Sequence, residues 1–200
     1  MIVIGDVHGC YDELMYLMDK LPYTDDLCFV GDLIDRGPDS KKVVDFIIKN
    51  NYKSVMGNHE EFINLSFNET GDGDLNINKE IYEIWLINGG DQTLKSFDDT
   101  FFDYLDWFKS LPLYIIHKHF LISHSYANNG INTNRDDLLW QRQFWMPMKD
   151  DLINIFGHTI QWDGPVQFQY KHWCIDTGCF KTGNLTAVDL KTMKFYSTRR

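Results

Sequence analysis

The sequence has 200 residues, 44% of them hydrophobic and 15% aromatic, which is enough to bury a full core. Its 29 acidic and 19 basic residues give a net charge of −10, which argues against nucleic acid or an anionic membrane surface as the main partner. The first residues do not have the pattern of a secretory leader, and no apolar run approaches the roughly 18 residues that cross a membrane. We therefore expect one domain over residues 1–200 and a cytoplasmic location, with the oligomeric state left open.

Three short apolar runs at the start of the chain are each followed by a polar, glycine-bordered loop and a segment with helical spacing. The runs are residues 2–4, 27–30 and 54–56, and the helices are expected over 10–21, over 40–50 and after residue 60. The loops between them contain Asp6, Asp32 and Asn58, which are spaced at intervals of 26 residues. Such an interval fits consecutive β-α units of a parallel sheet, whose strand ends lie side by side.

The sequence pattern changes after residue 66. Residues 66–111 are expected to form a helical insertion beside the site, with a polar loop at 71–74 and helices near 81–87 and 101–108. Strand-like runs then return at residues 114–116, 120–122, 153–156, 173–175, 185–190 and 195–197. The four cysteines lie in or beside predicted strands, so we expect small core residues and not a disulfide framework. This order of elements predicts an α/β fold.

Six side chains that can bind metal ions share one position relative to the predicted strands. Each follows a strand and lies near a glycine or another small residue; they are Asp6, His8, Asp32, Asn58, His124 and His158. Carboxylate, imidazole and amide groups without cysteine suit Mn²⁺, iron or Zn²⁺ better than a structural thiolate zinc site. Because six ligands exceed what one ion needs beside its substrate, we expect two divalent ions with a bridging carboxylate, and Mn²⁺ is the first candidate.

The loops also carry recognisable motifs. GDVHG at 5–9, GDLIDRG at 31–37 and GNHE at 57–60, followed by a lone histidine and GHT at 157–159, resemble the phosphoprotein phosphatase branch of the calcineurin-like metallophosphoesterases. Within that family, the chain is most similar to the short serine/threonine protein phosphatases of bacteria and phages, the lambda-phosphatase type. The resemblance extends from Gly5 to about Leu190. It implies a β-sandwich of two mixed sheets flanked by helices.

The resemblance implies a role for each residue of these motifs. Asp6 and His8 would bind the first ion, Asp32 would bridge both ions, and the second ion would be bound by Asn58, His124 and His158. The substrate phosphate would be held by Arg36, Arg142 and Asn58, because a guanidinium matches the geometry of phosphate oxygens. His59 would act as the general acid that protonates the leaving oxygen, and Asp35 would orient it, so these two form the catalytic pair.

These roles predict metal-dependent hydrolysis of a phosphomonoester, with phosphoserine or phosphothreonine in a protein or peptide as the substrate. One alternative is a symmetrical diadenosine tetraphosphatase, a relative with the same metal motifs that acts on a dinucleoside polyphosphate. Another is a pseudo-phosphatase that binds phosphorylated partners without turnover, although every expected ligand and the general acid are present. The C-x5-R loop of thiol phosphatases and the P-loop of nucleotide triphosphatases are absent from the sequence, which excludes those chemistries.

Two further features receive structural interpretations. Glu60 could support a neighbouring metal ligand, but the interpretation that we favour is a negative charge in the first turn of a helix. The tryptophans, Trp85 among them, are expected in the core or at the rim of the site, because the acidic balance argues against base stacking.

Overall fold

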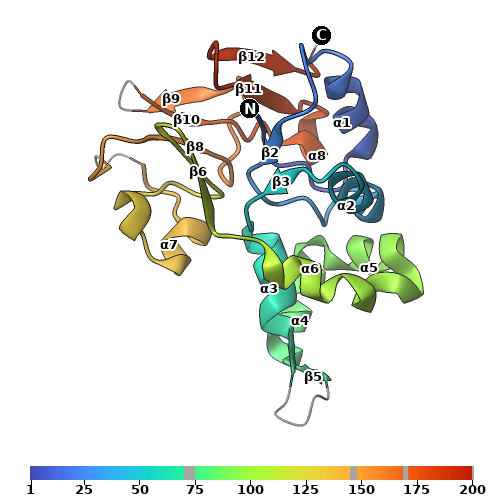
Figure 1. The fold of residues 1–200 in the computed structure, drawn as a ribbon. Coiled ribbons are helices and arrows are strands. Elements are labelled where there is room, and N and C mark those ends of the chain that lie inside the picture. The colour runs from blue at the N-terminus through green and yellow to red at the C-terminus, as the bar shows by residue number, and fades with distance from the viewer. Residues whose placement is uncertain (70–74, 145–147, 169–170, 200) are drawn as a thin grey trace.

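The strands of the early β-α units lie side by side in the first of two sheets (Figure 1). The computed structural model describes residues 1–69, 75–144, 148–168 and 171–199. β1 (Ile2–Ile4), β2 (Leu27–Phe29) and β3 (Lys53–Ser54) run parallel, as the regular spacing of their loops predicts. They are connected by α1 (Tyr11–Met18) and α2 (Ser40–Lys49), and the sheet continues beyond β1 with the antiparallel strands β11 (Thr186–Asp189) and β12 (Lys194–Ser197).

The second sheet comes from the later part of the chain. Its strands, in spatial order, are β6 (Tyr114–His117), β7 (Phe120–Ser123), β8 (Ile153–Phe156), β10 (His172–Cys174) and β9 (Val166–Phe168). β7, β8 and β10 are parallel, whereas the edge strands β6 and β9 are antiparallel to their neighbours. Every strand run expected after residue 111 appears in one of the two sheets, and β9 is an additional strand.

The core is divided between the two faces of the first sheet. Val3 packs in one cluster with Ile122 and Ile155 of the second sheet. Because side chains alternate along a strand, Ile4 points to the other face and packs with Leu14 of α1. The four cysteines are buried, as expected of small core residues. The predicted α/β sandwich of two mixed sheets flanked by helices is therefore confirmed.

The segment expected as a helical insertion forms short helices that lie together with α3 at one end of the sandwich (Figure 1). They are α4 (Lys79–Trp85), a π-helical turn (Leu86–Gly90), α5 (Asp91–Phe97), a 3₁₀ helix (Asp98–Tyr104) and α6 (Leu105–Ser110). β4 (Phe67–Glu69) and β5 (Leu75–Ile77) pair in a hairpin that the sequence pattern did not predict. The polar loop predicted at 71–74 lies outside the described residues.

The remaining helices are short. α3 (Asn58–Ser66) begins several residues earlier than expected, so the GNHE motif forms its first turn. α7 (Arg135–Trp140) precedes Arg142, and α8 (Cys179–Thr182) and a 3₁₀ turn (Gly130–Asn132) complete the set. Among the residues that the structure describes, no helix combines the length and the apolar composition needed to cross a membrane.

Candidate active site

The candidate ligands come from loops that follow strands of both sheets. Asp6 and His8 follow β1 and Asp32 follows β2, in loops where the backbone of His8 and Asp32 takes positive φ values of 47° and 49°. His124 follows β7 and His158 follows β8. All five side chains are buried. Loops that are far apart in sequence therefore meet at the carboxyl ends of parallel strands, as the sequence predicts.

Three of the predicted ligands form a tight group with acceptor atoms facing each other. Asn58 Oδ1 lies 2.8 Å from His124 Nε2 and 2.9 Å from His158 Nδ1, and those two nitrogens are 3.1 Å apart. His124 Nδ1 donates to the carbonyl of Val30 at 2.9 Å, so its Nε2 carries a lone pair. Asp32 Oδ1 lies 3.4 Å from that nitrogen. Convergent lone pairs of this kind fit a metal ion, because a cation satisfies all of them at once.

A second group forms around the other oxygen of Asp32. His8 Nε2 lies 3.4 Å from Asp32 Oδ2, and His8 Nδ1 is directed by the carbonyl of Ile34 at 2.8 Å. Asp6 Oδ2 accepts from the backbone N–H of His158 at 3.0 Å, whereas Asp6 Oδ1 has no hydrogen-bond partner among the described residues. Asp32 thus presents one oxygen to each group, which is the arrangement expected of a bridging carboxylate.

The histidines of both groups are held in the form that binds metals. Burial lowers the pKa of His8 well below its ordinary value in spite of the opposing effect of Asp32. Burial likewise lowers the pKa of His124, and it lowers the pKa of His158 to about 2. These imidazoles are therefore neutral near pH 7, and a neutral ring nitrogen is what a metal ion requires.

The acidic groups of the site repel one another. Burial, and then the charges of Asp176 and Asp32, raise the pKa of Asp6 well above its ordinary value. Burial also raises the pKa of Asp176 to about 7, with a contribution from Asp32. Bound cations would relieve this repulsion, so the carboxylates as well as the lone pairs fit a metal centre. Asp176 was not among the predicted site residues, although it lies only two residues after the end of a strand, β10.

His59, Asp35 and Arg36 form a row beside the group of Asp6 and His8. His59 Nδ1 lies 2.6 Å from Asp35 Oδ2, and Arg36 Nη2 lies 2.8 Å from His59 Nε2. Arg36 Nη1 lies 2.7 Å from His8 Nε2, and its guanidinium stacks on the ring of Phe180 at 4.4 Å. Burial acts to lower the pKa of His59, but the nearby carboxylates, led by Asp32, outweigh it and the net pKa is raised. A raised pKa favours an imidazolium that can donate a proton.

His59 also lies close to the metal-binding groups. Its Nε2 is 3.9 Å from Asp32 Oδ2, and it forms a possible ligand group with His8 and Asp32. Its other nitrogen, however, is already directed to Asp35. The geometry therefore offers two roles, acid or ligand, that an experiment on His59 can separate.

Arg142 lies at the other side of the site. Its Nη1 donates to the backbone carbonyl of His158 at 3.2 Å, so the guanidinium is anchored next to the group of Asn58, His124 and His158. Arg36 lies next to His8, and Arg142 lies next to His158. Together they give the candidate site a local positive charge, although the net charge of the chain is −10.

Glu60 has a more specific position than the sequence indicated. Its carboxylate is fully buried and accepts backbone N–H groups from Asp32 at 2.9 Å, from Leu33 at 2.8 Å and from Gly57 at 2.8 Å. Glu60 does lie in the first turn of α3, as expected, and its hydrogen bonds also give it the supporting role that the sequence offered as the alternative. Glu60 ties the loop of Asp32 to the start of α3, which fixes Asp32 relative to Asn58.

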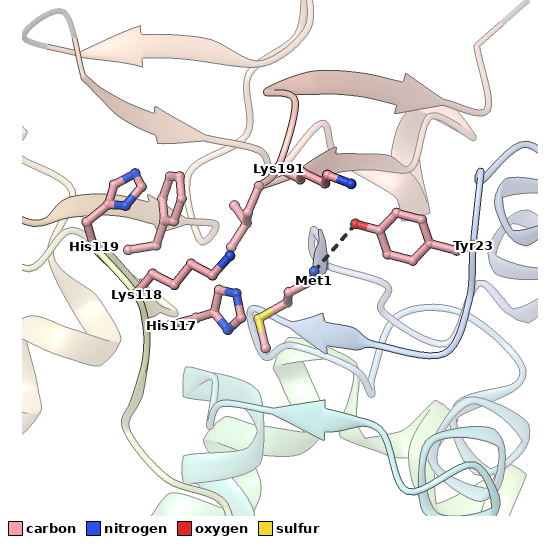
Figure 2. Close-up of a pocket in the computed structure, with 8 residues that line it drawn as sticks. Met1, Tyr23, His117, Lys118, His119 and Lys191 are labelled. Carbon is pink, nitrogen blue, oxygen red and sulfur yellow. Dashed lines mark hydrogen bonds between the residues drawn. The ribbon is translucent and has the colours of Figure 1, made fainter.

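A separate pocket of about 280 Å³ lies at the other end of β1 (Figure 2). Met1, which precedes β1, lines it, whereas Asp6 follows β1, so the pocket is distinct from the candidate site. Tyr23 receives a hydrogen bond from the amino group of Met1 at 3.4 Å and donates to Asp189 at 2.6 Å. These contacts tie β1 to the end of β11, which is a structural role.

Comparisons with known proteins agree on one family and return relatives with two different named activities. The family described as calcineurin-like phosphoesterase matches residues 1–188. Serine/threonine-protein phosphatase 2 of Salmonella typhimurium strain LT2 is 32% identical over 213 residues, which cover 94% of this chain and 92% of the relative. The symmetrical bis(5'-nucleosyl)-tetraphosphatase of Buchnera aphidicola is 47% identical over 62 residues, which cover 28% of this chain and only 22% of that enzyme. The crystal structure of a candidate diadenosine tetraphosphatase superposes with a TM-score of 0.73 and 21% identity, covering 98% of this chain and 91% of the other.

Proposed function

The chain belongs to the calcineurin-like phosphoesterases and is a hydrolase of the phosphatase kind, and we propose that its substrates are phosphoserine and phosphothreonine in proteins. The similarity to a bacterial serine/threonine-protein phosphatase along nearly the whole of both chains supports this substrate class. The observation that carries the proposal is the meeting of the two metal-binding groups on Asp32 beside the row of Arg36, His59 and Asp35. We also keep the proposal of a single catalytic domain in the cytoplasm.

The proposed metal centre holds two divalent ions, with Mn²⁺ as the first candidate and iron or Zn²⁺ as alternatives. Asp6 and His8 would bind the first ion and Asp32 both ions, and the second ion would be held by Asn58, His124 and His158. The unpartnered Asp6 Oδ1 and the convergent lone pairs of Asn58, His124 and His158 support this set. When bound, such ions supply an activated water as the nucleophile and neutralise charge on the phosphoryl oxygens.

The proposed substrate-binding groups are Arg36, Arg142 and Asn58. A guanidinium can donate two parallel hydrogen bonds to phosphate oxygens, and the stacking of Arg36 on Phe180 limits the orientations that its fork can take. The guanidinium of Arg142 is held by the carbonyl of His158, on the opposite side. Two guanidinium groups would therefore grip the phosphate from two directions and exclude neutral substrates.

The proposed proton donor to the leaving oxygen is His59. Its Nδ1 is occupied by Asp35 at 2.6 Å, so the proton would be donated from Nε2. In this structure Nε2 accepts from Arg36 Nη2 at 2.8 Å, and it would be freed to carry the proton when Arg36 turns to the substrate phosphate. Asp35 is fully buried and stabilises the imidazolium, and this keeps the proton available near neutral pH. The leaving alkoxide would take this proton and depart as an alcohol.

A second candidate function is the symmetrical hydrolysis of diadenosine tetraphosphate. It is favoured by the 47% identity to a tetraphosphatase within a 62-residue segment. That segment covers less than a third of this chain. The short match supports shared metal chemistry more than a shared substrate, so we rank this function second. A silent pseudo-phosphatase is disfavoured because every proposed ligand and the proposed acid are present.

The test compares the two substrates on one preparation. Purified protein loaded with Mn²⁺ is assayed for phosphate release from a phosphoserine peptide and for nucleotide release from diadenosine tetraphosphate. We expect a kcat/KM at least about tenfold higher on the phosphopeptide. A preference for the dinucleotide would assign the second function, and turnover of neither compound would contradict the proposal.

A further inference from the structure

The carboxylate of Asp35 is held by two residues of the segment 85–93, which runs from the last residue of α4 through the π-helical turn into the first turn of α5. Trp85 Nε1 donates to Asp35 Oδ2 at 2.9 Å and to Oδ1 at 3.1 Å, and Thr93 Oγ1 donates to Oδ1 at 2.5 Å. With His59 on Oδ2, both oxygens are fully engaged. Asp35, Trp85 and Thr93 are all completely buried, so no bulk water competes for these bonds.

The same segment also holds the backbone of the loop. The N–H of Asp35 donates to Thr93 Oγ1 at 2.8 Å, and the N–H of Arg36 donates to the carbonyl of Gly89 at 3.3 Å. Asp35 and Arg36 have positive φ values of 70° and 69°, which are unfavourable for residues other than glycine. Such a conformation persists only when surrounding contacts enforce it, and segment 85–93 supplies several of them.

The sequence of the segment suits this close approach. Gly89 has a φ of 108°, and a Cβ on it would lie 2.7 Å from the backbone nitrogen of Arg36. A Cβ on Gly90 would lie 2.5 Å from the indole of Trp85. The two adjacent glycines therefore let the segment reach the loop and leave room for the Trp85 ring.

We propose that Thr93 and Trp85 are positioning residues for the Asp35–His59 pair, an inference that rests on the proposed role of His59 as proton donor. They lock the carboxylate of Asp35 in the one rotation that engages His59 Nδ1, and so direct His59 Nε2 at the leaving oxygen. Trp85 also packs on Phe101 and Phe67, so its removal would disturb the core. The hydroxyl of Thr93 makes hydrogen bonds to Asp35 and lies 3.1 Å from the hydroxyl of Ser40, so its removal changes polar contacts and not the apolar core, which makes Thr93 the sharper probe.

The first test is spectroscopic and needs no turnover. In protein without added metal, the proton on His59 Nδ1 is observed by NMR and assigned as the imidazole signal that disappears in His59→Asn. We expect Thr93→Val, which removes the hydroxyl but keeps the shape, to shift or broaden this signal, and Thr93→Ser, which restores the hydroxyl, to leave it in place. An unchanged signal in a folded Thr93→Val protein would overturn the inference.

The second test uses the leaving group. A proton donor matters most when the leaving oxygen is strongly basic, so the aligned pair should be needed for a phosphoserine peptide more than for p-nitrophenyl phosphate. We expect Thr93→Val to lower kcat about tenfold or more on the peptide, with a several-fold smaller loss on p-nitrophenyl phosphate and with Thr93→Ser close to the parent protein. Equal losses on both substrates would contradict positioning of the acid. If the parent protein hydrolyses neither compound, the proposed function fails, while the NMR comparison still decides whether Thr93 orients the pair.

Discussion

At the scale of single residues, side chains that are adjacent in the sequence make different contacts in the candidate site. Asn58 presents its amide oxygen to two histidines, while the next residue, His59, is turned to Asp35. The start of α3 makes this division, because consecutive side chains on a helix point in different directions.

Replacement of His59 by asparagine separates the roles of acid and ligand. We expect His59→Asn to lower kcat by about 100-fold or more, because a positioned acid contributes about that much, and to retain two metal ions per chain. Steady-state kinetics and metal analysis by mass spectrometry of the same sample check both parts. Loss of one ion would instead make His59 a ligand beside His8 and Asp32.

His172 predicts a dependence of stability on pH that does not involve the candidate site. It is fully buried, its Nδ1 accepts the N–H of Asn154 at 3.0 Å, and burial, with Lys171 nearby, lowers its pKa from 6.5 to about 4 despite Asp150. Between these pH values the unfolded chain takes up a proton on His172 that the native protein does not. The free energy of unfolding should therefore fall as the pH decreases from about 6.5 to about 4.

The contribution of His172 is measured with a matched pair of variants. Urea unfolding at several pH values should give a flatter dependence in this range for His172→Gln than for the parent protein. His119→Gln, which changes an exposed histidine, is the control and should keep the parent slope. Identical slopes for all three proteins would show that His172 is not the titrating group.

At the scale of elements, the π-helical turn between α4 and α5 links the helical segment to the loop of Arg36. We expect Gly89→Ala to raise KM about tenfold or more, because the new Cβ would push on the backbone of Arg36, and to cost roughly 2 kcal/mol of folding free energy. Gly164→Ala is the control, since Gly164 also has a positive φ, of 121°, but a Cβ there meets nothing within 4 Å. Similar KM values for the two variants would contradict the link.

Sequence reasoning succeeded where local pattern and structure coincide. β1 has the predicted bounds. The loops after the parallel strands bring the predicted ligands together, because such loops lie at the carboxyl edge of a parallel sheet. The start of α3 was missed because the GNHE motif belongs both to the loop and to the first helical turn. The hairpin of β4 and β5 was missed because its short polar strands have no strong periodicity.

The supporting contacts could not be predicted from pattern at all. Thr93 is 58 residues from Asp35 in sequence and Trp85 is 50, so their hydrogen bonds depend on how the helical segment packs against the sandwich. The acceptor role of Glu60 likewise depends on two loops meeting across 28 residues. The hydrogen-bond partner of a buried polar side chain can be identified only when the tertiary structure is known.

At the scale of the whole molecule, the sandwich brings together candidate site residues from the two ends of the chain. Asp6 accepts a hydrogen bond from His158, which lies 152 residues further along. The overall charge of −10 would repel a phosphorylated substrate, yet two guanidinium groups flank the candidate metal ligands, and bound ions would add to that local positive field. Fold and electrostatics therefore concentrate positive charge at one place on an acidic protein.

The central claim is that a metal centre bridged by Asp32 hydrolyses phosphomonoesters. The most direct measurement is phosphate release from p-nitrophenyl phosphate by purified protein that has been stripped with a chelator and then titrated with Mn²⁺, with Asp32→Asn treated in parallel. The account predicts that activity is lost on chelation, returns with Mn²⁺ in the parent protein and stays at least about 100-fold lower in Asp32→Asn. Full activity in the chelator, or an Asp32→Asn protein as active as the parent, would contradict it.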